Sequence, residues 1–221
     1  MTDIPLVEIV EHRTSTDAAE VVAEEAAMWL GICCLAGSAT VALPGGRSPA
    51  AMLAALASHP IAWNRITVTT TDERQVPIGH VLSNMGNVRR AFDGRFGQSA
   101  TFVPLDRYDT AHLIRIPFDL LILGMGADGH IASLFPGSLL DGPGCQPLIA
   151  LTPDPLPIEA PVPRWSWSLS TLASARRTLL ICAGEAKQAA LEKALQAGSS
   201  PLGALLRRAK GPVTIHWAET A

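Results

Sequence analysis

Hydrophobic and polar residues follow two alternating patterns along the chain. Short apolar or β-branched runs, which are typical of strands, occur at residues 38–43, 65–72, 118–124, 177–184 and 212–218. The run "FDLLILG" at 118–124 is hydrophobic at almost every position. Such a run indicates a central parallel strand that is covered on both faces.

Between these runs the pattern changes to that of helices. Residues 17–30 are rich in Ala and Glu, and Asp17 and Glu20 have the spacing of a capping box. Ser48-Pro49 predicts a helix start, with Ser48 as the N-cap and a helix that runs to about residue 57. Further helices are expected at 87–92, at 185–197 and from Ser200-Pro201 onward.

This alternation of strands and helices predicts the fold class. It favours a three-layer α/β/α domain with a mostly parallel, Rossmann-like sheet and right-handed crossovers, in one domain over residues 1–221. Residues 143–164 interrupt the rhythm with seven prolines, too many for a regular element. We expect an ordered surface excursion there, which would form a rim or lid over a site.

Composition and charge exclude several classes of protein. Hydrophobic residues make up 48% of the chain and charged residues 17%, so the chain is globular and not disordered. The net charge of −3 argues against a nucleic-acid partner. No window of the sequence holds the roughly 18 consecutive apolar residues of a membrane span. The acidic N-terminus is no signal peptide. The four cysteines lack C-x-x-C spacing, which predicts reduced thiols in a cytoplasmic protein.

Ligands of open parallel sheets bind at the carboxyl ends of the strands. The loop at 124–137 has the G-x-G-x-x-G spacing of a dinucleotide turn, but Asp128 would repel a pyrophosphate there. Pro136 also lies where the helix of that motif should run. His130 in the same loop can take a proton from water at neutral pH, although a lone histidine is also often structural.

Three other strand ends, at residues 44–49, 71–76 and 184–187, offer sites for an anion. Gly45 and Gly46 permit close approach of a backbone, and a helix N-terminus follows them. A plain capped turn, or a degenerate nucleophile elbow at 46–50, is the alternative for this loop; the elbow lacks its last glycine. Arg74 suits bidentate binding of a phosphate, with Asp72 fixing polar groups nearby, unless residues 71–76 are only a solvated turn.

Arg164 and Lys187 are open to two interpretations, as surface cations or as counter-charges of an anion. No His or Cys cluster has the spacing of metal ligands, so no metal is expected.

Taken together, these loops resemble the 6-phosphogluconolactonase family. The matching motifs are "PGGRSP" (44–49), "TDERQVP" (71–77) with Ser83-Asn84, "GMGADGHIASLFPG" (124–137) and "PRWSWSL" (163–169) followed by "GEAK" (184–187). The resemblance implies hydrolysis of 6-phospho-D-glucono-1,5-lactone to 6-phospho-D-gluconate, the second step of the oxidative pentose phosphate pathway, without metal or organic cofactor. The partner it implies is a small phosphosugar lactone.

The resemblance also implies roles for individual residues. His130 corresponds to the family's general base on water, and we group Asp128 with it as catalytic. Basic side chains and the glycine turn would bind the substrate and its phosphate. These binding residues are Gly45, Gly46, Arg47, Ser48, Asp72, Arg74, Arg164 and Lys187. The family's usual GG[ST]TP turn has Arg47-Ser48 in this chain, so position 47 departs from the pattern.

Two other functions remain as alternatives. Glucosamine-6-phosphate deaminases have a similar DGHxAFNEP motif, but Phe135 occupies the position of its glutamate in this chain. A sugar-phosphate-sensing domain of a transcription regulator would need a DNA-binding module. The stretch before residue 38 is similar to a strand plus a helix, with no basic recognition helix.

Overall fold

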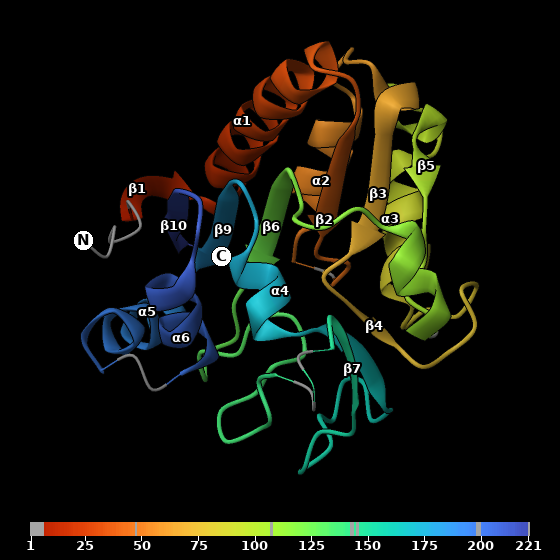
Figure 1. The fold of residues 1–221 in the computed structure, drawn as a ribbon. Helices are drawn as coiled ribbons and strands as arrows, with labels where there is room; N and C mark the ends of the chain where they lie inside the picture. Colours follow the sequence, from red (N-terminus) through yellow and green to blue (C-terminus); the bar gives the residue numbers. More distant parts are fainter. Residues whose placement is uncertain are drawn as a thin grey trace.

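The computed structural model describes residues 7–46, 48–106, 108–141, 144, 146–197 and 200–220. Seven strands form its main sheet: Val7–Thr14 (β1), Ala39–Leu43 (β2), Ile66–Thr70 (β3), Thr101–Phe102 (β5), Leu120–Gly124 (β6), Thr178–Ala183 (β9) and Val213–Thr220 (β10). Their order is β1-β10-β9-β6-β2-β3-β5, and every neighbouring pair is parallel (Figure 1).

Helices cover both faces of this sheet. The α-helices are Ser15–Leu35 (α1), Ala50–Ala57 (α2), Asn84–Phe92 (α3), Leu169–Ala173 (α4), Glu185–Ala197 (α5) and Pro201–Arg208 (α6). Short 3-10 helices occupy Trp63–Arg65, Phe96–Ser99 and Tyr108–Leu113.

The central strand β6 shows how the layers are built. Leu120 and Ile122 belong to the hydrophobic core shared with α1, α2 and α3, whereas Leu121 and Leu123 belong to the core shared with α4, α5 and α6. Successive side chains of a strand point to opposite faces, so a continuously apolar strand is buried on both. The predicted three-layer α/β/α fold with a parallel sheet is therefore confirmed.

A second, smaller sheet lies at one end of the molecule. It contains Asp72–Arg74 (β4), Leu148–Leu151 (β7) and Arg164–Trp167 (β8), which pair antiparallel in the order β4-β8-β7. The expectation that residues 143–164 hold no regular element is wrong for β7. Pro147 and Pro153 bracket a proline-free apolar run, and that run forms the strand. The alternative of a solvated turn at 71–76 is wrong for the first part of this segment, because Asp72–Arg74 forms β4.

Two helix starts differ from the predicted ones. The N-cap of α1 is Thr14, whose hydroxyl accepts from the Asp17 N–H at 3.1 Å while Asp17 Oδ2 accepts from the Thr14 N–H at 3.2 Å. The capping box therefore lies one turn earlier than the Asp17–Glu20 spacing suggested. The N-cap of α2 is Pro49 without a side-chain bond, so Ser48 does not cap this helix. Ser200 caps α6 as predicted, accepting from the Gly203 N–H at 3.1 Å.

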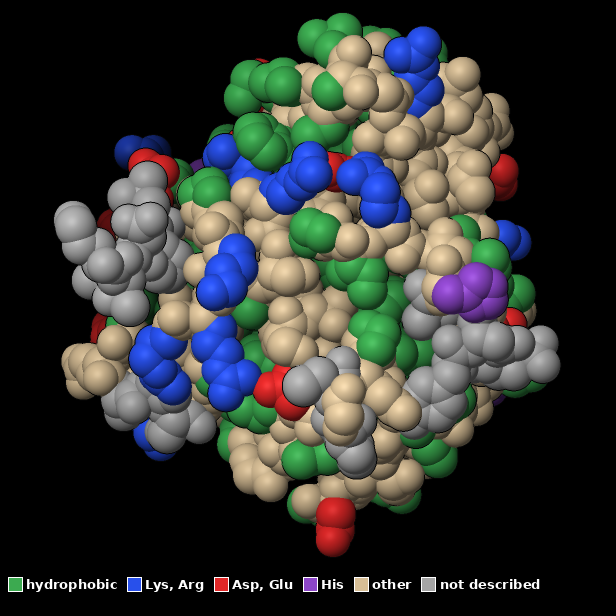
Figure 2. Space-filling model, in the orientation of Figure 1, with side chains coloured by type: hydrophobic (Ala, Val, Ile, Leu, Met, Phe, Trp, Pro, Cys, Tyr) green, Lys and Arg blue, Asp and Glu red, His purple; other side chains and the backbone are tan. Residues whose placement is uncertain are grey.

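The outer face of α1 exposes apolar side chains. Met28, Ile32 and Leu35 are more than half exposed, and Figure 2 shows hydrophobic side chains over the part of the molecule where this helix ends. Among the described residues, none of the helices combines the length and the apolar character needed to cross a membrane.

The topology determines where a ligand can bind. From β2 the chain continues to β3 on one side, whereas from β6 it continues to β9 on the other. The order of connection thus reverses between the adjacent strands β2 and β6. In open α/β sheets the crevice at the carboxyl end of such a switch point is the usual ligand site.

Candidate functional site

A cleft of about 1060 Å³ opens at this switch point, along the carboxyl ends of β2, β3, β6 and β9. Glu159 and Ala160 from the proline-rich segment also line it, so this segment forms part of the rim. The cleft brings together most of the residues singled out from the sequence: Gly45, Gly46, Ser48, Asp72, Arg74, His130, Arg164 and Lys187. Asp128 lies beside it against His130, and Arg47 lies outside the described residues.

His130 and Asp128 form a hydrogen-bonded pair on the loop after β6. His130 Nδ1 lies 2.6 Å from Asp128 Oδ1, and the same oxygen accepts from the His130 backbone N–H at 3.1 Å. Burial raises the pKa of Asp128, but the backbone hydrogen bond and the nearby imidazole outweigh it, so this pKa lies below its ordinary value. An ionised carboxylate only accepts hydrogen bonds, so in the neutral imidazole Nδ1 is the protonated nitrogen and Nε2 carries the free lone pair.

Two neighbours restrict the imidazole of His130. A Cβ added at Gly126 would lie 2.1 Å from His130 Nδ1 and 2.6 Å from Asp128 Oδ1, so only glycine fits beside the pair. The Phe135 ring lies against the other part of the imidazole, with the ring centroids 4.7 Å apart. The second glycine of the G-x-G-x-x-G spacing thus serves close packing, which gives that spacing a physical reason unrelated to nucleotides.

Two arginines form the cationic wall of the cleft. Arg74 of β4 and Arg164 of β8 are directly opposite each other in the small sheet, an arrangement of like charges that ordinarily destabilises a strand pair. Arg164 is 5% exposed, donates to the Ala160 carbonyl at 3.1 Å and lies over the Phe135 ring. Burial lowers the pKa of Arg164, although Asp72 acts in the opposite direction. The Nε atoms of both arginines are buried and lack a hydrogen-bond partner.

Asp72 begins the same strand as Arg74 and is 6% exposed. Its Oδ1 accepts from Asn84 Nδ2 at 3.0 Å and from Thr71 Oγ1 at 3.2 Å, and its Oδ2 accepts from the Ser133 hydroxyl. All three donors are uncharged side chains. The carboxylate is therefore held within the wall by neutral partners.

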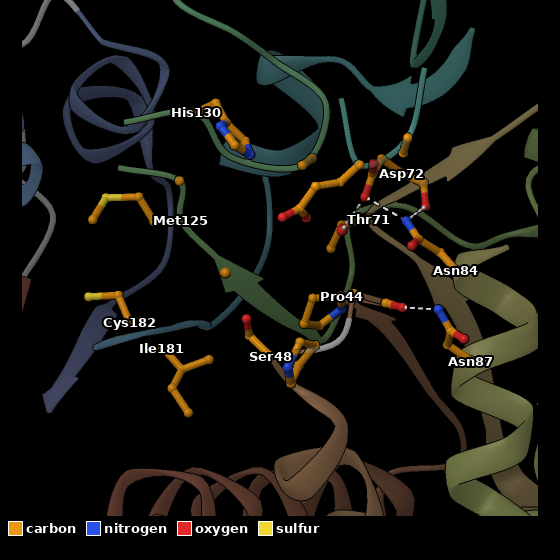
Figure 3. Close-up of a pocket in the computed structure, with 18 of the residues that line it drawn as sticks. Pro44, Ser48, Thr71, Asp72, Asn84, Asn87, Met125, His130, Ile181 and Cys182 are labelled. Atoms are coloured by element: carbon orange, nitrogen blue, oxygen red, sulfur yellow. Dashed lines mark hydrogen bonds between the residues drawn. The ribbon is translucent and has the colours of Figure 1, made fainter. Parts of the chain in front are cut away.

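The glycine turn after β2 packs against the start of α3. A Cβ at Gly45 would lie 2.4 Å from the Asn84 Cα, and the Gly45 carbonyl accepts from Asn87 Nδ2 at 2.7 Å. Gly46 has only Pro49 near its Cβ position, at 3.8 Å. The turn needs glycine at position 45 for packing, whereas Gly46 and Ser48 line the cleft, where Figure 3 labels Ser48.

Lys187 and Cys182 line the far side of the cleft. Lys187 comes from the first turn of α5 and is half-buried. Burial raises the pKa of the Cys182 thiol to about 11, more than the nearby lysine lowers it. Cys182 is therefore protonated at neutral pH and is no nucleophile. In the described part of the chain, no three His, Cys, Asp or Glu residues come together as metal ligands.

Three polar residues of this region were given no role by the sequence. Glu73 is 5% exposed and accepts from the backbone N–H groups of Arg74, Asn84 and Met85, which ties β4 to the start of α3. Burial raises the pKa of Glu73 despite these bonds. Asn84 and Ser133 bind Asp72 as described above. The local signal for Asn84 was Ser83, which caps α3, but nothing in the local sequence indicates the contact of Asn84 with Asp72.

Comparisons with known proteins agree with this picture. The family of glucosamine-6-phosphate isomerases/6-phosphogluconolactonase matches residues 13–217. A 6-phosphogluconolactonase of Pseudomonas aeruginosa is 38% identical over 205 residues, which cover 82% of each chain. One from Pseudomonas putida is 41% identical over 199 residues, covering 82% of this chain and 80% of the relative.

A solved structure extends the comparison to the fold. The crystal structure of a 6-phosphogluconolactonase from Shewanella baltica covers 99% of both chains with a TM-score of 0.86 and 26% sequence identity. Together these similarities confirm the family resemblance that the loop motifs indicated.

Proposed function

Since the chain belongs to the glucosamine-6-phosphate isomerase/6-phosphogluconolactonase family, we propose that it hydrolyses 6-phospho-D-glucono-1,5-lactone to 6-phospho-D-gluconate. Its relatives from two Pseudomonas species carry the name of this activity. One observation carries the proposal at the level of chemistry: a histidine that is hydrogen-bonded to a carboxylate lines the same cleft as Arg74, Arg164 and Lys187.

His130 is the general base of the proposed reaction. The lactone carbonyl is electrophilic enough that an activated water suffices, so no covalent nucleophile is needed. As the water oxygen bonds to C1, Nε2 of His130 takes a water proton, while Asp128 holds Nδ1–H and stabilises the imidazolium. Collapse of the tetrahedral oxyanion breaks the ring C–O bond, and the imidazolium returns the proton to the leaving oxygen. General-base help of this kind is typically worth about 10²–10⁴-fold.

The cationic wall anchors the phosphate at the other end of the substrate. Arg74 and Arg164 present guanidinium groups at the cleft, and Lys187 contributes a third positive charge from the far side of the cleft. The turn with Gly45, Gly46 and Ser48 also lines the cleft, on the side where Figure 3 labels Pro44 and Ser48, and it offers backbone N–H groups. A phosphate held there positions C1 near His130, and such positioning lowers the barrier substantially.

The Phe135 side chain argues against the deaminase alternative. An aromatic ring packs against His130 at the position where a deaminase motif has its glutamate. No carboxylate is therefore available at this position to assist opening of a sugar ring.

A coupled assay tests the proposal. Glucose-6-phosphate dehydrogenase generates the lactone in place, and 6-phosphogluconate formation is compared with the spontaneous rate. We expect acceleration by the protein. Release of ammonia from glucosamine 6-phosphate would instead favour the deaminase, and sugar-phosphate binding without either reaction would favour a sensing domain.

A further inference from the structure

The Asn84 side chain lies beside Asp72 in the wall of the cleft (Figure 3). It also forms a hydrogen bond with Arg74, so it joins the two charged residues. Asn84 is 2% exposed and is the first residue of α3. Its backbone N–H donates to Glu73 Oε1 at 2.7 Å, so its main chain is fixed. The side chain consequently has little freedom to move relative to its two charged neighbours.

The amide group of Asn84 fits in only one orientation. Nδ2 donates to the Asp72 carbonyl at 2.8 Å and to Asp72 Oδ1 at 3.0 Å, while Oδ1 accepts from Arg74 Nη1 at 2.6 Å. A flipped amide would place its NH₂ against the guanidinium and its oxygen against the carboxylate. Both contacts would be repulsive, since a guanidinium only donates and a carboxylate only accepts.

The Asn84 amide lies between two opposite charges, those of Asp72 and Arg74. Asp72 and Arg74 are two positions apart in β4, so their side chains leave the same face of the strand, where an ion pair is expected. No ion pair joins them in the part of the chain that the structure describes. Arg74 Nη1 instead donates to two neutral acceptors, Asn84 Oδ1 and the Leu82 carbonyl, the latter at 2.9 Å. The guanidinium therefore lies in the same wall of the cleft as Asp72 without forming an ion pair with it.

We propose that Asn84 is a positioning residue that separates Arg74 from Asp72 and thereby leaves the Arg74 charge for the substrate phosphate. The inference rests on the proposed function and deepens it, because it names a residue that determines affinity for the anion without contacting the reacting carbon. A neutral amide is suited to this role: it satisfies both charged groups by hydrogen bonds and cancels neither charge.

The decisive variant is Asn84→Asp, which keeps the shape of the side chain. Its carboxylate would pair with Arg74 directly and would lose the donor bonds to Asp72. We expect the Kd for inorganic phosphate, measured by calorimetry, to rise at least about tenfold, because charge-assisted bonds to the anion are lost. KM for the lactone should rise in parallel, while kcat stays within about threefold. Asn64→Asp, on an exposed 3-10 helix, is the matched control for the added charge and should leave both constants unchanged.

A double exchange separates this role from a merely structural one. Asp72→Asn combined with Asn84→Asp restores one carboxylate and one amide, so stability lost to carboxylate repulsion should return. The carboxylate would still pair with Arg74, so we expect phosphate affinity to remain weak in the exchanged variant. Recovery of wild-type affinity there, or wild-type affinity in Asn84→Asp itself, would overturn the proposal.

The phosphate measurement also distinguishes this inference from the proposed reaction. Calorimetry needs no turnover, so weaker phosphate binding by Asn84→Asp stands even for a protein without lactonase activity. Conversely, if the protein is an active lactonase and Asn84→Asp leaves its phosphate affinity unchanged, the proposed function stands and the role of Asn84 is refuted. A wild-type protein that binds no inorganic phosphate at millimolar concentration would also overturn it.

Discussion

Replacing Gly126 by alanine tests the geometry of the proposed base more directly than removing the base. The backbone at Gly126 lies outside the left-handed region, so alanine is conformationally allowed there. Its Cβ, however, would lie 2.1 Å from His130 Nδ1 and 2.2 Å from Cε1. The three atoms nearest to that Cβ position belong to His130 and Asp128, so the substitution acts first on the imidazole and its carboxylate partner.

The size of the effect follows from these distances. An ordinary van der Waals contact begins at 3.4 Å, so the ring must withdraw by about 1.3 Å. The Nδ1–Oδ1 distance to Asp128 is 2.6 Å, and a shift of that size takes it beyond hydrogen-bonding range. A displacement of about 1 Å in a catalytic group costs about 10²-fold in rate. We expect kcat to fall about 100-fold, or about 2.7 kcal/mol in activation free energy, with little change in KM.

The coupled lactonase assay measures this loss, and thermal unfolding shows whether the variant is folded. Gly79→Ala is the matched control, because no atom lies within 4 Å of its Cβ position and Gly79 does not line the cleft. Turnover by a folded Gly126→Ala variant within about threefold of the wild type would refute the reasoning. Such a result would mean that the rate of hydrolysis does not depend on the exact position of the His130 imidazole.

Three further predictions concern the base, the glycine turn and the core. His130→Ala should lower kcat at least about 10²-fold with a modest change in KM, as steady-state kinetics will show. Gly45→Ala should lower Tm by roughly 2–12 °C because its Cβ meets the α3 backbone at 2.4 Å, whereas Gly46→Ala should leave the melting curve almost unchanged. Burial lowers the pKa of His216 below its ordinary value of 6.5, so the unfolded chain takes up the proton more readily. The free energy of unfolding should therefore be highest above about pH 6.5 and fall at lower pH, and chemical denaturation of His216→Gln should show a weaker dependence.

Local patterns predicted the main sheet because each of its inner strands carries its own signal. The β6 run is apolar at consecutive positions, and burial on both faces follows from that alone. The position of the cleft also follows, since parallel strands bring their carboxyl ends to one edge. The sequence alone therefore predicts that His130 and Gly45 lie in one region of the fold.

The small sheet could not be predicted in the same way. The β4 strand consists of three charged residues, and such a segment ordinarily indicates a turn. Its stability comes from pairing with β8, some ninety positions along the chain, and from buried hydrogen bonds such as that of Asn84 to Asp72. Only the folded chain reveals these long-range contacts. The roles of the site residues remain predictions, although the cleft brings the described ones together.

The pairing of Arg74 with Arg164 has a consequence for local unfolding. Two facing cations weaken the small sheet, and its strands come from distant parts of the chain, so it should be among the first elements to open. A bound phosphate dianion would lie against both charges and remove their repulsion. Binding and local opening of the small sheet are therefore linked. An anion that binds only the closed sheet should increase the protection of the β4 and β8 amides against hydrogen exchange. A small sheet that is less stable without ligand would therefore bind such an anion more weakly, because part of the binding free energy would be used to close the sheet.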